Sequence, residues 1–333
     1  MLRRRTTFAL ASMAAVLTVS VATDAFASGF AAARFGGERG NPTEFNPTSL
    51  YYNPAGYGFS DGTNIYLDVN TAYRVSSYDR PESAIDVPTD RPLTDDEIAA
   101  NSGESTLTNI IVAPALAVTT DFGADLPVKF GFGFFAPFGG AAVWDKTTSS
   151  SDFPGAQDGS QRWYSIDGSI TTLALSAGAA YQLKGPRLSL GLSGNLYLST
   201  INTLRARNAD GTDELVDSAP NLKEGRSWVD VSSTDYGIGA GLLWEAWRRK
   251  AWIALSYQSA PNLTGKMTYS GSLKNLLAVS PQTNDDIEMT GSLPDILRWG
   301  LRVRPNARNE VRIFGDVSFW SRFDQQCLYN ATV

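Results

Sequence analysis

Alternation of apolar and polar residues recurs along most of this chain. In LSLGLSGNLYLS, residues 188–199, leucines hold one parity while serine, glycine and asparagine hold the other. That period of two is typical of a β-strand with one apolar face. The pattern predicts nine strands, at about 63–75, 105–120, 127–138, 164–183, 187–206, 229–247, 250–268, 288–305 and 310–323.

The connections between these strands alternate in length. The long ones are 76–104, 139–163, 207–228 and 269–287; the short ones are 121–126, 184–186, 248–249 and 306–309. Soluble sandwiches also alternate apolar and polar positions, but long loops at one rim and tight turns at the other are typical of outer-membrane barrels. Aromatic residues near strand ends fit a lipid–water boundary. They are Trp163, Tyr164, Tyr181, Tyr236, Trp244, Trp247, Trp252, Tyr257 and Tyr269.

The N-terminus predicts export. Arginines at positions 3–5 precede an apolar run from about Phe8 to Val21, and Ala25-Phe26-Ala27 fits a leader-cleavage site. We therefore interpret residues 1–27 as a signal peptide. The alternative, a membrane-anchoring helix, would need roughly 20 apolar residues.

Composition excludes several functions. The chain has no histidine and one cysteine, Cys327, so a Ser-His-Asp site, an internal disulfide and the usual metal ligands are missing. The formal net charge is -6, and the only basic run beyond the leader is Arg248–Lys250, which disfavours nucleic acid. We expect no enzyme activity, no metal and no cofactor.

Four segments carry a family resemblance. YYNPAGYG (51–58), PFGG (137–140), RWYSIDGSITTLALSAGAAYQLKGPRLSLGLSGNLY (162–197) and LPDILRWGLRVRPNARNEVRIFGDVSFWSRFD (293–324) resemble the FadL/TodX family of outer-membrane transporters for long-chain fatty acids and aromatic hydrocarbons. The resemblance implies an all-β fold, a transmembrane antiparallel β-barrel of 14 strands with an N-terminal hatch in its lumen. It also implies passive uptake, with hydrophobic substrate leaving sideways through the wall at a kinked third strand.

The partners then expected are a fatty acid or aromatic hydrocarbon and outer-membrane lipid, with the protein a monomer. The alternative is a general porin or structural barrel without a dedicated hydrophobic ligand. Nine strands are fewer than 14 and odd in number, whereas bacterial single-chain barrels have even numbers. We therefore expect the chain to be a C-terminally truncated version of a longer product.

We assign residues 28–61 to the hatch and 62–333 to the barrel. Prolines in FNPTSLYYNPAGYG (45–58) interrupt regular structure, and the aromatic content argues against the alternative of a disordered tail. The predicted hatch residues are Tyr51, Tyr52, Asn53, Pro54, Ala55 and Gly56.

The third strand, VKFGFGFFAPFGG, is the predicted place of a lateral opening. Glycine inside a strand often marks a bulge, and proline removes a ladder hydrogen bond. The residues concerned are Gly131, Gly133, Pro137 and Phe138. The alternative, small residues packing against the plug, stays open.

Two sets of residues are predicted ligand contacts. Family comparison points to the loops at 207–228 and 269–287, where Leu273, Leu276 and Leu277 have near-helical spacing; a helix packed on the neighbouring loop is the alternative. The inward-facing arginines Arg298, Arg302 and Arg312 form the second set, because guanidinium groups pair with carboxylates. They equally balance acidic neighbours such as Asp68 and Asp316.

Overall fold

The computed structural model describes residues 35–88, 90–124, 127–149, 151–278, 282–319 and 328–330. The chain divides into two units, residues 1–31 and 32–333, and all described residues belong to the second. The predicted signal peptide and Cys327 lie outside the described residues. Within those residues, no helix has the length and apolar character needed to cross a membrane.

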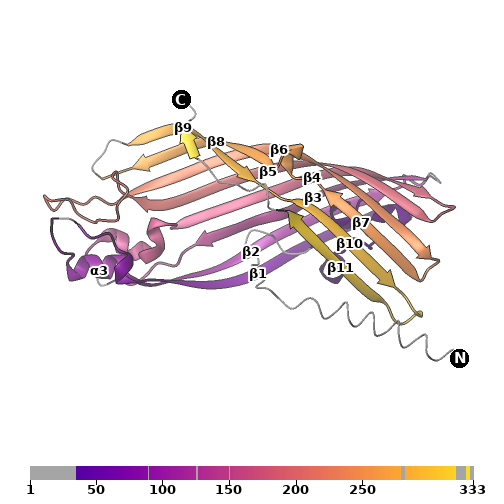
Figure 1. Cartoon of the computed structure of the whole chain (residues 1–333), viewed down its shortest axis with the longest axis horizontal. Helices are drawn as coiled ribbons and strands as arrows, with labels where there is room; N and C mark the ends of the chain where they lie inside the picture. Colours follow the sequence, from indigo (N-terminus) through magenta and orange to yellow (C-terminus); the bar gives the residue numbers. More distant parts are fainter. Residues whose placement is uncertain are drawn as a thin grey trace. The chain divides into compact units, whose positions relative to one another are not determined.

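One antiparallel sheet dominates the structure (Figure 1). Its first six strands pair in chain order. They are β1 (Asn64–Arg80), β2 (Gly103–Thr120), β3 (Val128–Val143), β4 (Asp167–Leu183), β5 (Leu188–Arg207) and β6 (Gly225–Trp247). The others are β7 (Ala251–Gln258), β8 (Lys266–Leu276), β9 (Thr283–Ser292), β10 (Asp295–Val303), β11 (Val311–Phe319) and β12 (Leu328–Asn330).

The last six strands lie end to end in pairs. β7 pairs with residues 239–247 of β6, while β8 pairs with residues 226–232 of the same strand. β10 then pairs with β7 and β9 with β8, and β11 and β12 continue alongside β10 and β9. The described strands thus occupy nine rows, the number that the alternation predicts.

Two of these rows are interrupted at proline, which lacks the N–H a ladder needs. β7 ends before the 3₁₀ turn η6 (Pro261–Leu263), and Pro294 separates β9 from β10. The Asp295 carboxylate joins the two interruptions, accepting hydrogen bonds from Tyr257 Oη (2.5 Å) and the Ala260 N–H (2.9 Å). The expectation of a long loop at 269–287 is wrong, because most of these residues form the β8–β9 hairpin.

Burial along the strands is the reverse of that in a soluble sandwich. On β5, Leu190 and Leu192 are exposed whereas Ser189 and Ser193 are buried. An apolar outer face and a polar inner face are what a strand in hydrocarbon requires. Most of the predicted boundary aromatics face outward, but Trp252 and Tyr269 are buried on the inner side.

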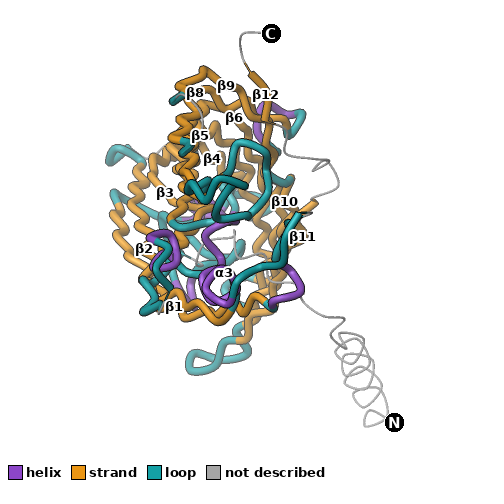
Figure 2. Tube along the Cα trace, turned by 90° about the vertical axis from the view of Figure 1, so that its left-hand side faces the viewer, coloured by secondary structure: helices purple, strands orange, loops and turns teal. Residues whose placement is uncertain are grey.

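Short helices lie in the loops and on the inner face of the sheet, inside the curve of the strands (Figure 2). The loop helices are η3 (Glu82–Ala84), α3 (Asp95–Asn101), η4 (Pro154–Asp158) and η5 (Ser160–Trp163). Residues 35–61, here the inner segment, contain η1 (Gly37–Arg39), α2 (Ser49–Tyr52) and η2 (Gly56–Phe59). In the main core cluster, Phe35, Leu50, Tyr52 and Tyr57 pack against inward residues of the sheet.

Candidate functional site

Asn-Pro turns shape the inner segment. The Oδ1 atoms of Asn46 and Asn53 accept hydrogen bonds from the N–H groups two residues on, at 2.9 and 3.1 Å. Each side chain thereby supplies a bond within a stretch that proline keeps out of regular structure. Asn41 makes the same turn, with a 3.0 Å bond from the Thr43 N–H. Sequence reasoning missed Asn41-Pro42, although the repeated Asn-Pro-Thr at 41–43 and 46–48 is its signal.

Asn53 also fastens the inner segment to the wall. Its Nδ2 donates to the carbonyl oxygens of Pro42 (2.9 Å) and of Leu242 on β6 (3.0 Å). Close approach is possible because the facing wall positions are glycines. A Cβ on Gly241 would overlap Asn53 Oδ1, and one on Gly191 of β5 would overlap the Pro54 backbone.

The other predicted hatch residues are also enclosed. Ala55 is fully buried, in a cluster with Leu243, Trp252 and Ala254. A Cβ on Gly56 would lie 2.7 Å from that of Ser49.

The tyrosine doublet joins the inner segment to two strands of the wall. Tyr51 packs against Phe135 of β3, with ring centres 5.4 Å apart. Tyr52 donates from its hydroxyl to the Phe35 carbonyl oxygen (3.0 Å) and accepts from Ser256 Oγ of β7 at its own carbonyl (2.5 Å).

Two of the predicted arginines hold the inner segment. Arg298 stacks 4.7 Å from the Tyr51 ring centre and donates to the Tyr51 carbonyl oxygen (3.3 Å). The Arg302 guanidinium lies 4.9 Å from the ring centres of both Phe45 and Trp252. Their role as ligand contacts stays a prediction; the contacts described are with the inner segment and the wall.

Glu310, in the turn before β11, forms ion pairs with three arginines. Its carboxylate pairs with Arg302 (3.1 Å), Arg304 (2.5 Å) and Arg312 (2.5 Å), and Arg312 also pairs with Glu44 of the inner segment (2.8 Å). Burial raises the pKa of Glu310, but the hydrogen bonds from Arg304 and Arg312 and the charge of Arg302 outweigh burial and bring the pKa to about 2. Sequence reasoning missed Glu310.

The ladder between β2 and β3 stops midway. It runs from Thr120↔Phe130 to Ala115↔Phe135, whereas β3 continues alongside β4 to Val143. Beyond the ladder, the Asp145 N–H donates to the Thr106 carbonyl oxygen (2.9 Å). The wall therefore has an interval without a ladder between residues 107–114 and 136–144, here called the wall gap.

Each strand carries a proline where the ladder ends. Pro137 lies in the register shift between Phe135 and Phe138 on β3, and Pro114 on β2 directly precedes the last paired residue. Sequence reasoning missed Pro114, although a proline inside an alternating segment is its signal.

The predicted opening residues separate into two groups. Pro137 and Phe138 lie at the wall gap. Gly131 and Gly133 lie within the intact ladder, where a Cβ would approach Leu50 to 3.3 and 3.0 Å respectively. These two glycines thus make room for the inner segment.

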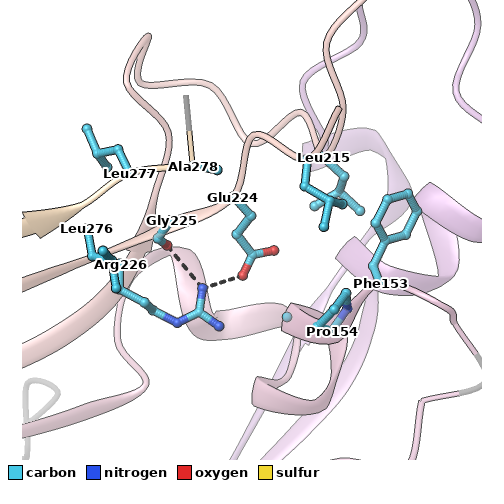
Figure 3. A pocket seen from close by; sticks show the side chains of 11 residues that line it. Phe153, Pro154, Leu215, Glu224, Gly225, Arg226, Leu276, Leu277 and Ala278 are labelled. Carbon is cyan, nitrogen blue, oxygen red and sulfur yellow. Dashed lines mark hydrogen bonds and ion pairs between the residues drawn. The ribbon is translucent and has the colours of Figure 1, made fainter. Parts of the chain in front are cut away.

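A pocket of about 400 Å³ lies among the long loops (Figure 3). Its apolar lining includes Phe153, Leu215, Leu222, Leu276 and Leu277. Glu224 and Arg226 form an ion pair of 2.6 Å on its side. The structure thus brings two of the three predicted leucines together here.

The third predicted leucine, Leu273, is buried within β8. The near-helical spacing is misleading, because residues 266–276 form a strand.

Known proteins share this fold. Residues 6–332 match the model of the family described as outer membrane protein transport protein (OMPP1/FadL/TodX). No curated protein sequence matches significantly. A FadL homologue of Pseudomonas aeruginosa superposes with a TM-score of 0.62 at 16% identity, over 91% of this chain and 72% of that chain.

Two toluene transporters are also similar in fold. Ralstonia pickettii TbuX has a TM-score of 0.55 at 19% identity, over 86% of this chain and 70% of that chain. P. putida TodX has a TM-score of 0.58 at 16% identity, over 85% of this chain and 68% of that chain. The family is one of transport proteins rather than enzymes. With an outward apolar face, an enclosed inner segment and a family match over nearly its whole length, this chain belongs to the OMPP1/FadL/TodX family of outer membrane transport proteins.

Proposed function

We propose that this protein takes up hydrophobic small molecules passively across the outer membrane and releases them sideways through the wall gap between β2 and β3. Residues 1–27 act as a cleaved signal peptide, the segment to residue 61 as the hatch, and the remainder as the barrel, which works as a monomer in outer-membrane lipid. The observation that carries the proposal is the ladder that ends at Ala115↔Phe135 while both strands continue. In hydrocarbon an unpaired ladder is costly, so such an interval is expected where function uses it.

The inner segment supports this route. Phe135, at the last paired position of β3, packs against Phe35 and Tyr51 with ring centres 5.6 and 5.4 Å away. Movement of the inner segment would therefore act directly on Phe135, at the end of the wall gap where the ladder stops.

The pocket among the long loops is the proposed place of first binding. Its leucine-rich lining suits an alkyl chain or an aromatic ring, because apolar contact area supplies most of the affinity in such sites. Two similar structures are described as toluene transporters. We therefore propose fatty acids or aromatic hydrocarbons as the substrate class.

A double substitution tests lateral release. Pro114→Val with Pro137→Val restores two backbone donors at the wall gap, so the ladder can extend and uptake should fall several-fold. The assay is initial uptake of a radiolabelled fatty acid or toluene by cells that carry the full-length protein and no transporter of their own. Pro127→Val, in the short turn before β3, is the control and should leave uptake unchanged. Unchanged uptake in the double variant would rule out release through this gap.

Single-channel recordings separate the porin alternative. A hatched transporter should show no large, stable open state in a planar bilayer. A steady open pore would favour a general porin.

A further inference from the structure

Seven basic residues from distant parts of the sequence meet at the short-turn rim. They come from three turns, those between β4 and β5, β6 and β7, and β10 and β11. Backbone hydrogen bonds join the turns: the Glu245 N–H donates to the Arg187 carbonyl oxygen (2.9 Å), and the Arg304 N–H donates to that of Lys250 (2.7 Å). The cationic residues of this rim are Lys184, Arg187, Arg248, Arg249, Lys250, Arg304 and Arg308.

These three turns have more positive charge than their carboxylates neutralise. Glu245 pairs with Arg187 (3.8 Å) and Glu310 with Arg304 (2.5 Å). Within the part of the chain that the structure describes, Arg248, Arg249, Lys250 and Arg308 have no ion-pair partner. All four are exposed.

An aromatic residue of the outer face lies directly beside this charge. Trp247 is 63% exposed, and the Lys250 Nζ lies 4.7 Å from its ring centre. Trp244, on the same strand, is 43% exposed. Tryptophan prefers the level of lipid headgroups, and lysine beside it reaches the phosphate layer.

We propose that this rim is a binding surface for the headgroups of anionic phospholipids, such as phosphatidylglycerol, in the inner leaflet of the outer membrane. Short turns of outer-membrane barrels face the periplasm, which places the rim beside that leaflet. Free phosphate would match the charges alone, whereas a lipid matches both the charges and the tryptophans. This inference rests on the outer-membrane location of the family and not on the proposed route of transport.

The test is lipid retention by the full-length protein. The protein is placed in nanodiscs of equal parts phosphatidylglycerol and phosphatidylcholine, extracted gently, and its retained lipids are counted by native mass spectrometry. Wild type should retain phosphatidylglycerol preferentially, and 0.5 M NaCl should abolish the preference by screening.

Arg248→Gln with Lys250→Gln should lower the preference about 25-fold, since each basic residue near an anionic surface contributes about 1 kcal/mol. Lys146→Gln with Lys274→Gln is the matched control at the long-loop rim. It removes the same charge, and Lys274 lies 4.5 Å from the ring centre of Trp228. The control should keep the preference.

Three results would overturn the proposal: no preference in wild type, equal losses in both double variants, or displacement of the lipid by millimolar inorganic phosphate. Substrate uptake is measured in parallel. Normal uptake with lost lipid preference separates this surface from the transport pathway.

Discussion

Asn109 of β2 donates a 2.6 Å hydrogen bond from Nδ2 to the Ala141 carbonyl oxygen of β3, across the wall gap. Arg74 of β1, the cross-strand partner of Asn109, donates to the same oxygen from Nη2 and to Asn109 Oδ1 from Nε (3.3 Å). Side chains therefore bridge the two strands where the backbone ladder is interrupted.

Weakening of this bridge should ease opening of the gap. Asn109→Ala deletes one hydrogen bond across the gap, worth about 1 kcal/mol, so initial uptake should rise up to about fivefold if opening limits the rate. Asn202→Ala is the matched control. Asn202 of β5 accepts a hydrogen bond from Trp228 Nε1 of β6 (3.0 Å), and neither strand borders the wall gap. Unchanged uptake in Asn109→Ala would show that the Asn109 hydrogen bond does not limit opening.

Asn53 should matter more than Asn46 for docking of the inner segment. Asn53→Ala removes its own turn and two bonds from Nδ2, a loss of about 2–3 kcal/mol at roughly 1 kcal/mol per bond. Asn46→Ala removes only local bonds to Thr48. Protease cleavage within residues 35–61 of the detergent-solubilised protein should be faster in Asn53→Ala, and equal rates would contradict the wall attachment.

The hatch predicts a further change in conductance. Deletion of residues 29–60 should raise ion leakage through the reconstituted protein, because the side chains that fill the inner face are removed. The intact protein in the same bilayer is the reference. Identical currents would contradict a blocking role for this segment.

Glu310 predicts the pH dependence of leakage. Its folded pKa of about 2 lies below its ordinary value of 4.5, so its stabilising contribution is present above about pH 4.5 and is lost as pH falls through 2. Wild-type leakage should stay low down to pH 4 and rise only near pH 2. Glu310→Gln should leak already at pH 7, because it removes the carboxylate that pairs with Arg302, Arg304 and Arg312. Wild-type leakage that begins near pH 5 would show that Glu310 is not the controlling group.

The leucines of the loop pocket predict a defect confined to low substrate concentration. Leu277→Asp places a charge in the apolar lining, so the half-saturating concentration for uptake should rise about tenfold at an unchanged maximal rate. Val87→Asp, an exposed position in the β1–β2 loop outside the pocket lining, is the control. A fall in the maximal rate alone would place the role of Leu277 elsewhere.

Sequence periodicity determined the spanning strands, because a strand in hydrocarbon must present one apolar face and this requirement is local. The leucines of β5 show it residue by residue. The alternation does not reveal the interruptions at Pro261 and Pro294. A local pattern cannot show that a strand stops and that the next strand resumes beside the same neighbour. Residues 266–276 continue β7's row only because β6 is long enough to pair with both segments.

The site depended more on tertiary structure. Proline chemistry marked Pro137, and the aromatic doublet marked the inner segment, because both are properties of single residues and their neighbours. The contacts of Arg298 and Arg302 with the inner segment join positions about 250 residues apart in sequence, and parity shows only that they face inward. Likewise, hydrogen bonds between consecutive turns gather the basic rim. Pairing between distant segments sets which side chains meet, and no local pattern of apolar and polar residues encodes that pairing.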